Sequence, residues 1–494
     1  MSRATKSKEN TSPTANISIE DDADVVSFTT PRKVVEDILD RLDSESWDEN
    51  TTFIDIACKT GEFLVAIHDR LMVNKRLCEV YPDTPERSRH IIEKQLYAIV
   101  LSGSQKEKIA KRLGGYKNNL IYMYDYFYEI GKLRYGGAYT NLTCEIYKEF
   151  NRCFFDVVVG HPPYYEGKDK TGGKLPVYTE FVTFADELVE YGKGTISLII
   201  PCRWYNEIDS KIYSRIRYSL FRPSLKELHD FEDSTELFEN VSLVDGLCYY
   251  IKDNTYIGKC KVYEHWNNEI TVTERSWTGR DPVLIRKGQL QSIVDKVTSE
   301  CFWTIERNAT TLPSFGFNRS YRGKSSKSKD EEHSIRLLTS KGIYYIPRDR
   351  VKKNYDLIGS YNVYVGYGQD FERYFKSPSE AWKIRSIGIL EPSEVCTLTY
   401  LVVSSFDTLE EAEQCVKYLK TKFVRALVRA NTTTSTLTAS SFKFVPAIET
   451  YSDIDWSKSI AEIDEQLYKI FKLSKEDIDW IEKNIASMEG WLLS

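Results

Sequence analysis

Paired cysteines and long apolar runs are both missing from this 494-residue sequence. Its ten cysteines are scattered and no two of them form a CxxC pair, so neither a zinc site nor a disulfide framework is indicated. Together with the lack of a signal peptide, this favours a reducing, cytoplasmic location. No apolar run approaches the roughly 18–20 residues that a membrane-spanning helix needs. We therefore expect no bound metal and no membrane segment.

An excess of positive charge is also missing, because the formal net charge is −6 at pH 7. The overall charge therefore does not indicate nucleic-acid binding, and a DNA-binding protein of this composition must concentrate its cations locally. Hydrophobic residues make up 41% and charged residues 28% of the chain, which is ordinary for a globular protein. At about 100–200 residues per domain, the length predicts two to four domains.

Four regions follow one another along the chain. Residues 1–24 are polar and lack periodicity, and we predict that they form a disordered tail. Residues 25–253 show both strand-like and helix-like patterns and are predicted to be a first folded domain. Residues 254–332 are interpreted as a connecting region. Residues 333–494 are interpreted as a mixed α+β domain that includes a strong helical pattern at 408–430.

Within the first folded domain, apolar runs alternate with amphipathic patterns. Runs typical of buried strands lie at residues 52–57, 154–159 and 195–200. Apolar residues at helical spacing follow the first run at 63–71 and precede the third run at 178–189. This alternation predicts an α/β fold in which helices cover both faces of a parallel sheet, and such sheets bind ligands at the carboxyl ends of their strands.

The first candidate motif joins a buried strand to a helix through a turn of small residues. Residues 55–64 read D-I-A-C-K-T-G-E-F-L. Such a turn lets the backbone approach a ligand closely and directs the free N–H groups of the helix toward it. Gly61 can adopt the unusual backbone angles that the turn requires. An ordinary strand-to-helix turn without a ligand is the alternative interpretation.

The second motif is a stiff loop at the end of another buried strand. Residues 156–165 read D-V-V-V-G-H-P-P-Y-Y. Pro162 and Pro163 fix φ and remove two backbone donors, so that carbonyl groups of this corner face a site. With an acceptor at His161 and an aromatic ring at Tyr164, the loop is suited to hold a planar base that carries an amino group. The alternative is a strand end that is merely capped by prolines.

The order and spacing of these motifs resemble the amino-group DNA methyltransferases. In particular, the sequence resembles adenine-N6 methylases of bacterial restriction–modification systems, whose target-recognition domain follows the catalytic domain. The resemblance rests on Thr29-Thr-Pro31 for the family's TP, on residues 55–64 for DxACGTGxFL and on residues 161–164 for NPPY. Weaker similarities, the last at residues 441–446, extend it over nearly the whole chain after residue 25.

This resemblance implies a Rossmann-like, S-adenosylmethionine-dependent methyltransferase domain at residues 25–253 and a DNA-recognition domain at residues 333–494. It implies transfer of a methyl group from S-adenosylmethionine to adenine N6 in duplex DNA, in a restriction–modification or host-defence context. The residues implied to bind the cofactor are Thr30, Pro31, Asp55, Ala57, Cys58, Lys59, Gly61 and Asp125. Asp125 is the expected contact to the adenine of the cofactor.

The same resemblance assigns the catalytic loop to His161, Pro162, Pro163 and Tyr164. The target base must leave the duplex to be reached. It would then stack on Tyr164, while the side chain of His161 and the carbonyl group of Pro162 accept hydrogen bonds from its amino group. Those bonds would free the nitrogen lone pair for attack on the sulfonium methyl group, and holding the reactants in line does much of the remaining work.

Three positions depart from the family pattern. His161 stands where the family has Asn, Asp or Ser. Because only a neutral imidazole offers an acceptor, an unperturbed pKa of about 6.5 predicts that activity falls in mild acid. Lys59 replaces a glycine, and its ammonium group either meets the cofactor carboxylate or points to water. The strand at residues 96–101 is followed by Ser102-Gly-Ser104 and not by the acid that usually holds the ribose hydroxyls.

Two cation-rich stretches without acidic residues offer contacts to DNA phosphates. The first lies at residues 319–329 and the second at residues 417–447. A solvated basic face is the alternative interpretation for each stretch. The residues predicted to bind double-stranded DNA are Arg319, Arg322, Lys324, Lys420, Lys422, Arg425 and Arg429.

Other functions stay open at this point. One is a catalytically impaired DNA-binding subunit, because of His161, Lys59 and the missing acid. A second is a cytosine-N4 methyltransferase, since both targets are exocyclic amines, and RNA as the substrate is a third. We see no convincing PD-(D/E)xK nuclease pattern. Any DNA cleavage is therefore expected to reside in a separate restriction nuclease subunit.

Overall fold

The computed structural model describes most of the chain. The described residues are 29–100, 102–116, 118–123, 138–168, 174–205, 211–239, 241, 243, 245–276, 284–301, 303–324, 334–368, 382–432, 436–450 and 453–490. The predicted tail at residues 1–24 and the predicted cofactor contact Asp125 lie outside them. The chain divides into two compact units, residues 1–200 with 234–242 and residues 201–233 with 243–494. The predicted boundaries after residues 253 and 332 stay a prediction.

A parallel sheet forms the centre of the first unit. Its strands are β1 (Phe53–Asp55), β2 (Leu96–Val100), β3 (Asn119–Tyr122), β4 (Val157–Gly160) and β7 (Thr195–Pro201). They lie in the order β7-β4-β1-β2-β3, and every neighbouring pair is parallel. β1 and β4 are buried along their whole length, as expected of parallel strands that are covered on both faces.

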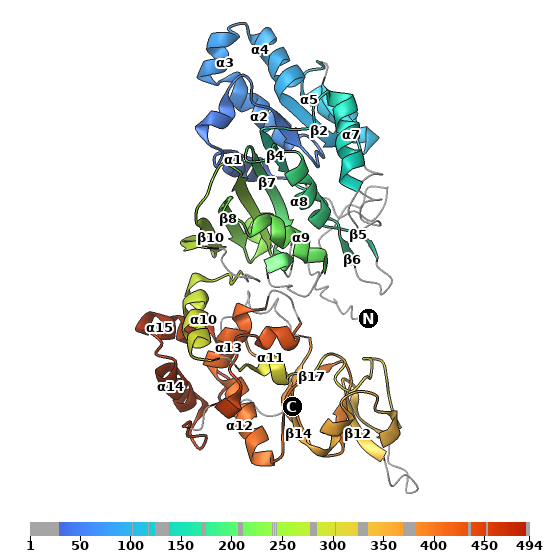
Figure 1. Cartoon of the computed structure of the whole chain (residues 1–494), viewed down its shortest axis with the longest axis vertical. Helices are drawn as coiled ribbons and strands as arrows, with labels where there is room; N and C mark the ends of the chain where they lie inside the picture. Colours follow the sequence, from blue (N-terminus) through green and yellow to red (C-terminus); the bar gives the residue numbers. More distant parts are fainter. Residues whose placement is uncertain are drawn as a thin grey trace, which may run out of the picture. The chain divides into compact units, whose positions relative to one another are not determined.

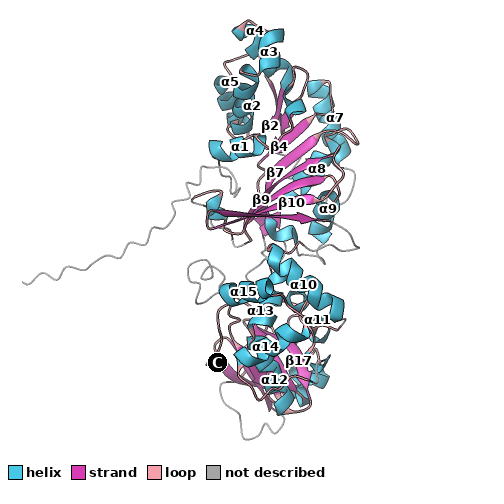
Figure 2. Ribbon diagram, turned by 90° about the vertical axis from the view of Figure 1, so that its left-hand side faces the viewer, coloured by secondary structure: helices cyan, strands magenta, loops and turns pink. Residues whose placement is uncertain are grey.

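Helices cover both faces of this sheet. Figure 2 shows α2 and α5 on one face and α7 and α8 on the other. The first unit also has a short antiparallel pair, β5 (Tyr165–Lys168) and β6 (Lys174–Pro176). Its helices, most of them labelled in Figure 1, are α1 (Arg32–Leu39), α2 (Glu62–Met72), α3 (Lys75–Val80), α4 (Thr84–His90), α5 (Gly103–Arg112), α7 (Ala138–Phe150) and α8 (Tyr178–Glu187).

The strand order reverses at the centre of the sheet. The chain proceeds outward from β1 through β2 to β3 and then returns to the other side of β1 as β4. This is the switch point of a doubly wound sheet, and ligands bind there beyond the carboxyl ends of the strands. The predicted Rossmann-like α/β class is confirmed. Both candidate motifs begin at this switch point, one after β1 and one after β4.

The strands of the second unit form one mixed set and two small sheets. The mixed set has the order β11-β10-β8-β9, and β10 is parallel to β8 while the other pairs are antiparallel. The small sheets have the orders β13-β12-β16 and β15-β14-β17. The strands are β8 (Leu225–Phe231), β9 (Leu247–Asp253), β10 (Cys260–Trp266), β11 (Glu269–Arg275), β12 (Ser334–Thr339), β13 (Gly342–Pro347), β14 (Tyr361–Gly366), β15 (Ile387–Leu390), β16 (Glu394–Cys396) and β17 (Tyr400–Phe406).

The helices of the second unit are α9 (Lys211–Leu220), α10 (Gly288–Glu300), α11 (Ile305–Asn308), α12 (Leu409–Lys420), α13 (Lys422–Ala430), α14 (Ile460–Ile470) and α15 (Lys475–Asn484). All of them except α9 pack around one apolar core with the β15-β14-β17 sheet. A smaller core lies between β12, β13 and β16 and the neighbouring Phe315 and Phe317. Within the described ranges, no helix has the length and apolar character to cross a membrane.

The structure differs from two sequence interpretations. The helical pattern at 408–430 is divided between α12 and α13, because Thr421 is extended and its hydroxyl group caps α13 by accepting the N–H of Val424. Both helices bury apolar residues in one core, which explains the continuous pattern. The segment at 254–332, interpreted as a connection, contains β10, β11, α10 and α11. β11 is mostly exposed and so lacks the apolar run that would have indicated a strand.

Candidate active site

The two candidate motifs lie side by side because β1 and β4 are neighbours. Asp55 is the last residue of β1 and pairs in register with Val159 of β4. Gly160 follows, and a Cβ atom there would lie 3.2 Å from Cγ1 of Ile56 and 3.4 Å from Oδ1 of Asp55. A larger residue at this position would crowd the switch point, so glycine lets the two strand ends approach one another.

The turn after β1 has the geometry of a ligand-binding turn. Gly61 has φ of 84°, which is in the left-handed region, and it is the N-cap residue of α2. The backbone N–H of Ala57 donates to Oδ1 of Asp55 over 3.1 Å. Cys58 is fully buried, and its N–H donates to the carbonyl of Ile99 in β2. The turn is therefore fixed at both ends, and the N-terminus of α2 faces the same edge of the sheet.

A small pocket joins residues from all three family motifs. The space amounts to about 230 Å³, part of it open to solvent, and its lining residues are Thr30, Asp55, Ala57, Lys59, Thr60, Glu62, Phe63 and His161. Pro31 lies next to the pocket as the N-cap of α1, and its carbonyl accepts the N–H groups of Val34 and Val35.

Asp55 and Lys59 give the pocket an unusual charge balance. Burial raises the pKa of Asp55 to about 7, although the N–H of Ala57, the thiol of Cys58 and the charge of Lys59 act in the opposite direction. Burial lowers the pKa of Lys59 to about 7, although the charge of Asp55 opposes this. Both groups therefore change charge near neutral pH. Such opposed shifts in a pocket are typical of functional sites.

His161 lies in the interior between two hydroxyl groups. Its Nδ1 is 2.9 Å from Oγ1 of Thr30, and its Nε2 is 2.8 Å from the hydroxyl of Tyr164. The His161 ring is 3% exposed and Tyr164 is 2% exposed. Phe238 stacks on the ring with centroids 5.2 Å apart and planes at 28°. The predicted catalytic residues Pro162 and Pro163 are buried as well.

The pH dependence expected from His161 needs correction. Burial, and after it the positive charge of Lys59, moves the pKa of His161 well below 6.5. The imidazole therefore stays neutral in mild acid and keeps an acceptor nitrogen there. A loss of activity between pH 5.5 and 8 is to be expected from Asp55 and Lys59 instead.

Sequence reasoning missed two partners of this site. The Thr30–His161 hydrogen bond joins residues 131 positions apart, and Phe238 comes from a segment that carries no family motif. The only sequence signal for the Thr30 contact was that Thr30 belongs to a family motif, for which no contact within the protein was predicted. At the end of β2, the hydroxyls of Ser102 and Ser104 lie 3.2 Å apart where the family has an acid.

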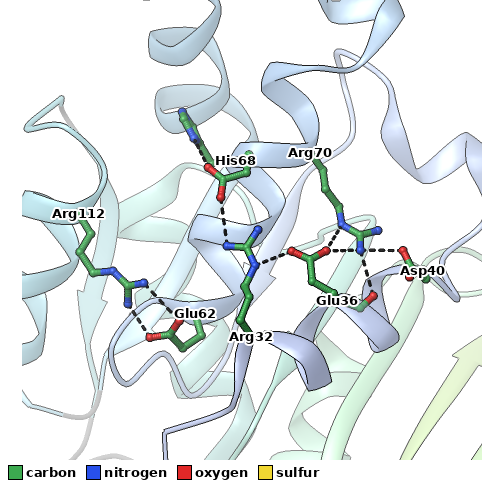
Figure 3. A network of polar contacts seen from close by, with 8 residues as sticks. Arg32, Glu36, Asp40, Glu62, His68, Arg70 and Arg112 are labelled. Atoms are coloured by element: carbon green, nitrogen blue, oxygen red, sulfur yellow. Dashed lines mark hydrogen bonds and ion pairs between the residues drawn. The ribbon is translucent and has the colours of Figure 1, made fainter.

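A polar network holds the motif segments together (Figure 3). Arg70 of α2 forms ion pairs with Glu36 and Asp40 of α1, and its Nη2 is 2.7 Å from Oδ1 of Asp40. Arg112 of α5 pairs with Glu62 at the start of α2 over 2.7 Å. These contacts tie α1, which follows Thr30, to the helix that follows the cofactor turn. Of the residues in these contacts, only Glu62 lines the pocket. The others hold the surrounding helices in place.

Comparisons with known proteins show similarity to restriction–modification methylases. Residues 117–238 match the family described as Eco57I restriction-modification methylase. Over 342 residues, the chain is 24% identical to an "Uncharacterized adenine-specific methylase" of Mycoplasma pneumoniae. The match covers 55% of this chain and 79% of the relative. The predicted resemblance to restriction–modification methylases is confirmed. With it, the methyltransferase class that the sequence predicted is confirmed.

Similar solved structures also come from restriction–modification systems. One is the type I restriction-modification system methyltransferase subunit of Streptococcus thermophilus, with 14% identity over 50% of each chain and a TM-score of 0.33. Another is the type IIL restriction-modification enzyme MmeI in complex with DNA, with 10% identity over 92% of this chain and 74% of the other and a TM-score of 0.45. The chain spans about half the length of the type I subunits it matches.

In this methylase-like chain, residues 319–324, the described part of the first predicted DNA-binding stretch, lie on the surface. Arg319 and Lys324 are exposed, and Arg322 is partly exposed over the ring of Tyr344. Lys324 also forms a backbone bridge with Tyr345 of β13. These cations therefore lie beside the β12–β13 hairpin, where a DNA backbone can reach them.

The second stretch is placed differently. Arg425 is fully buried, and its guanidinium group donates to the carbonyls of Thr421 and Trp382 over 3.1 and 3.3 Å. Lys420 is also buried, Arg429 is half-buried and paired with Glu232, and Lys422 is paired with Glu482. These contacts give Lys420, Lys422, Arg425 and Arg429 roles in packing. These four residues are therefore not proposed to contact DNA.

Proposed function

We propose that the chain is a site-specific methyltransferase that transfers a methyl group from S-adenosylmethionine to adenine N6 in double-stranded DNA. One observation carries the proposal: the turn at residues 55–61 and the corner at residues 161–164 meet over one pocket at the switch point of the sheet. The adenine-specific relative supports adenine over cytosine as the target. The family match supports a restriction–modification context, with a separate restriction nuclease subunit as a further proposed partner.

The residues of the pocket fit the proposed cofactor in their chemistry. Opposite charges on Asp55 and Lys59 match the ammonium and carboxylate groups of an amino-acid end, and Ala57 and Phe63 add apolar surface. Gly61 keeps the turn close to the ligand. Thr30, Pro31, Cys58 and Asp125 complete the set that the resemblance implies. When bound, S-adenosylmethionine supplies an electrophilic methyl group on a sulfonium centre.

The catalytic loop has the task of holding an amino group in a fixed place. Pro162 and Pro163 lack N–H groups, so the corner presents carbonyl oxygens and cannot compete as a donor. We propose that the carbonyl of Pro162 and one nitrogen of His161 accept the two amino hydrogens, which directs the nitrogen lone pair toward the cofactor pocket. Tyr164 would stack on the extruded base. Exclusion of water from this buried corner strengthens both hydrogen bonds.

The DNA-binding surface is proposed to lie on and around the β12–β13 hairpin. Arg319, Arg322 and Lys324 are the contacts that the sequence indicated. The described residues 319–324 and 334–356 hold nine Lys and Arg but two Asp and no Glu. One of the nine, Arg336, is paired with Glu394 of β16, and the other cations support the proposal of a wider cationic surface. Exposed cations supply affinity through phosphates without reading sequence.

Methylation of DNA by the purified full chain tests the function. Labelled S-adenosylmethionine and mixed genomic DNA are incubated with the protein, and the nucleosides are separated after digestion. We expect label in N6-methyladenine, whereas label in N4-methylcytosine would change the assigned target. Binding of the cofactor and DNA without transfer would support a catalytically impaired subunit. Failure to bind the cofactor or to modify any polynucleotide would contradict the proposal.

Salt dependence of DNA binding tests the surface. Replacing Arg319, Arg322 and Lys324 by Ala should lower the slope of log K against log salt by roughly one per lost phosphate contact. Lys472→Ala removes an exposed cation elsewhere and serves as the control. An equal loss of slope in both variants would contradict the placement of the surface.

A further inference from the structure

We propose that Thr30 is a positioning residue that sets the tautomer of His161, so that Nε2 carries the lone pair that accepts the target amino group. This inference rests on the proposed function, and it assigns Thr30 a task beyond the cofactor contact implied by the family resemblance. It also explains how histidine can occupy the position of the family's asparagine and still act as an acceptor.

The three side chains form an uninterrupted chain of hydrogen bonds. Oγ1 of Thr30 lies 2.9 Å from Nδ1 of His161, and the hydroxyl of Tyr164 lies 2.8 Å from Nε2. All three residues are at most 5% exposed, so water does not compete for either ring nitrogen. The face of the ring is fixed by Phe238. The ring therefore has one hydroxyl partner at each nitrogen and a fixed plane.

A neutral imidazole has one N–H and one lone pair, so this chain can run in two directions. In the first, Nδ1–H of His161 donates to Thr30, and the hydroxyl of Tyr164 donates to Nε2. In the second, Thr30 donates to Nδ1, and Nε2–H donates to Tyr164. The first direction is preferred because a phenol, with a pKa of about 10, is a stronger donor than an aliphatic hydroxyl. Thr30 then acts as the acceptor that holds the proton on Nδ1.

Burial, and after it the positive charge of Lys59, keeps the ring neutral. Lys59 lies in the same pocket, and its positive charge opposes protonation of His161. Asp55 and Glu62, which would favour protonation, line that pocket too, but burial and the charge of Lys59 determine the net direction. Thr30 and Tyr164 carry no charge at neutral pH. The tautomer, and not the charge, is therefore the property that the surroundings of His161 set.

Entry of the base then needs only one exchange. Tyr164 donates to Nε2 in the described structure, and the amino group of the base is also a donor. The base can thus replace the hydroxyl of Tyr164 without any proton moving on the ring. Thr30 keeps its bond to Nδ1 throughout, while Tyr164 becomes free to stack. The His161–Thr30 pair reproduces an amide, with an acceptor at one end and a donor at the other.

Nitrogen NMR of the full chain, labelled at its six histidines, tests the tautomer directly. We expect His161 to carry its proton on Nδ1 in the natural protein and in Thr30→Ser, which keeps the hydroxyl. Thr30→Val should shift the population toward the Nε2–H form. Thr29→Val is the matched control, because Thr29 is the exposed neighbour. A proton on Nε2 in the natural protein would overturn the proposal.

A double-mutant cycle tests the link to the reaction. Thr30→Val should lower kcat about tenfold or more, with Thr30→Ser restoring most of it, whereas loss of the cofactor contact should raise KM for the cofactor alike in the natural and His161→Asn backgrounds. In a His161→Asn background, Thr30→Val should have no further effect on kcat, because the acceptor no longer depends on a tautomer. An equal loss in both backgrounds would show that Thr30 acts elsewhere. If the protein methylates nothing while the NMR result holds, the proposed function fails and the tautomer assignment stands.

Discussion

Asp55 in the first unit and Glu232 in the second are both buried carboxylates beside cations, yet their pKa values move in opposite directions. Burial raises the pKa of Asp55 to about 7, and the charge of Lys59 offsets this only in part. Burial also acts on Glu232, but the charges of Lys287, Arg429 and a second arginine outweigh it and lower the pKa to about 2. The number of nearby cations decides the direction.

The geometry around Glu232 explains its stability as an anion. Its Oε2 is 3.1 Å from Nζ of Lys287 and 3.4 Å from Nη2 of Arg429. The guanidinium group of Arg429 also lies over the rings of Trp382 and Trp480, at 5.0 and 5.3 Å from their centroids. A fully compensated network of this kind holds structure together. The Asp55–Lys59 pair differs, because both of its pKa values lie near 7, which is typical of functional sites.

The largest effect that separates these two regions is expected from Arg429→Ala. Arg429→Ala leaves Glu232 with Lys287 and one arginine and removes the guanidinium group from Trp382 and Trp480. Because breaking a buried ion pair costs about 3–5 kcal/mol when no other cation is near, we expect a loss toward the lower end of that range. Urea or thermal unfolding should report this loss, whereas the salt dependence of DNA binding should not change. Arg322→Ala, at a partly exposed cation, should show the reverse. If Arg429→Ala keeps its stability but weakens DNA binding, the distinction between buried and surface cations is wrong.

The next effect concerns stability in acid. The folded pKa of Glu232, about 2, lies below the ordinary glutamate value of 4.5. Its contribution to the free energy of unfolding, about 3 kcal/mol, is therefore present above pH 4.5 and is lost as the pH falls toward 2. The stability difference between the natural protein and Glu232→Gln, measured by urea unfolding, should shrink over that range.

The Asp55→Asn variant should show the opposite pH dependence. Relative to the natural protein it should become more stable as the pH rises from about 4 to 7, because it removes a buried carboxyl group whose folded pKa is raised. Parallel curves for the two variants would contradict the comparison.

Sequence patterns were sufficient for the fold and the switch-point site because those features depend on local rules. A buried apolar run followed by a turn glycine or a diproline identifies a strand end, and neighbouring parallel strands bring such ends together. The fate of the cations was not accessible in this way. Arg322 and Arg429 look alike in sequence, and only the tertiary partners Glu232 and Trp382 distinguish them. The Thr30–His161 contact is equally non-local.

A smaller effect is expected on cofactor affinity. Lys59 loses its charge as the pH rises through about 7, and Asp55 loses its charge as the pH falls through about 7. Affinity for S-adenosylmethionine, measured by calorimetry, should therefore be greatest near pH 7. Lys59→Met should weaken binding about tenfold, or 1.4 kcal/mol, and remove the decrease at high pH. An analogue without the carboxylate group is the control, and it should bind both proteins alike. Equal losses for both ligands would mean that Lys59 does not meet the carboxylate.

The smallest effect is expected where an ion pair is not buried at all. Nζ of Lys472 lies 3.0 Å from Oε1 of Glu300, with side chains 76% and 49% exposed. Water solvates both charges whether or not they meet, so Lys472→Ala should cost less than about 1 kcal/mol in unfolding experiments. A loss as large as that of Arg429→Ala would mean that the ion pair itself, and not its burial, determines the energy. The contrast between Glu232 and Asp55 would then need another explanation. Our explanation assumes that burial raises the pKa of both carboxyl groups and that the nearby cations then decide the net direction.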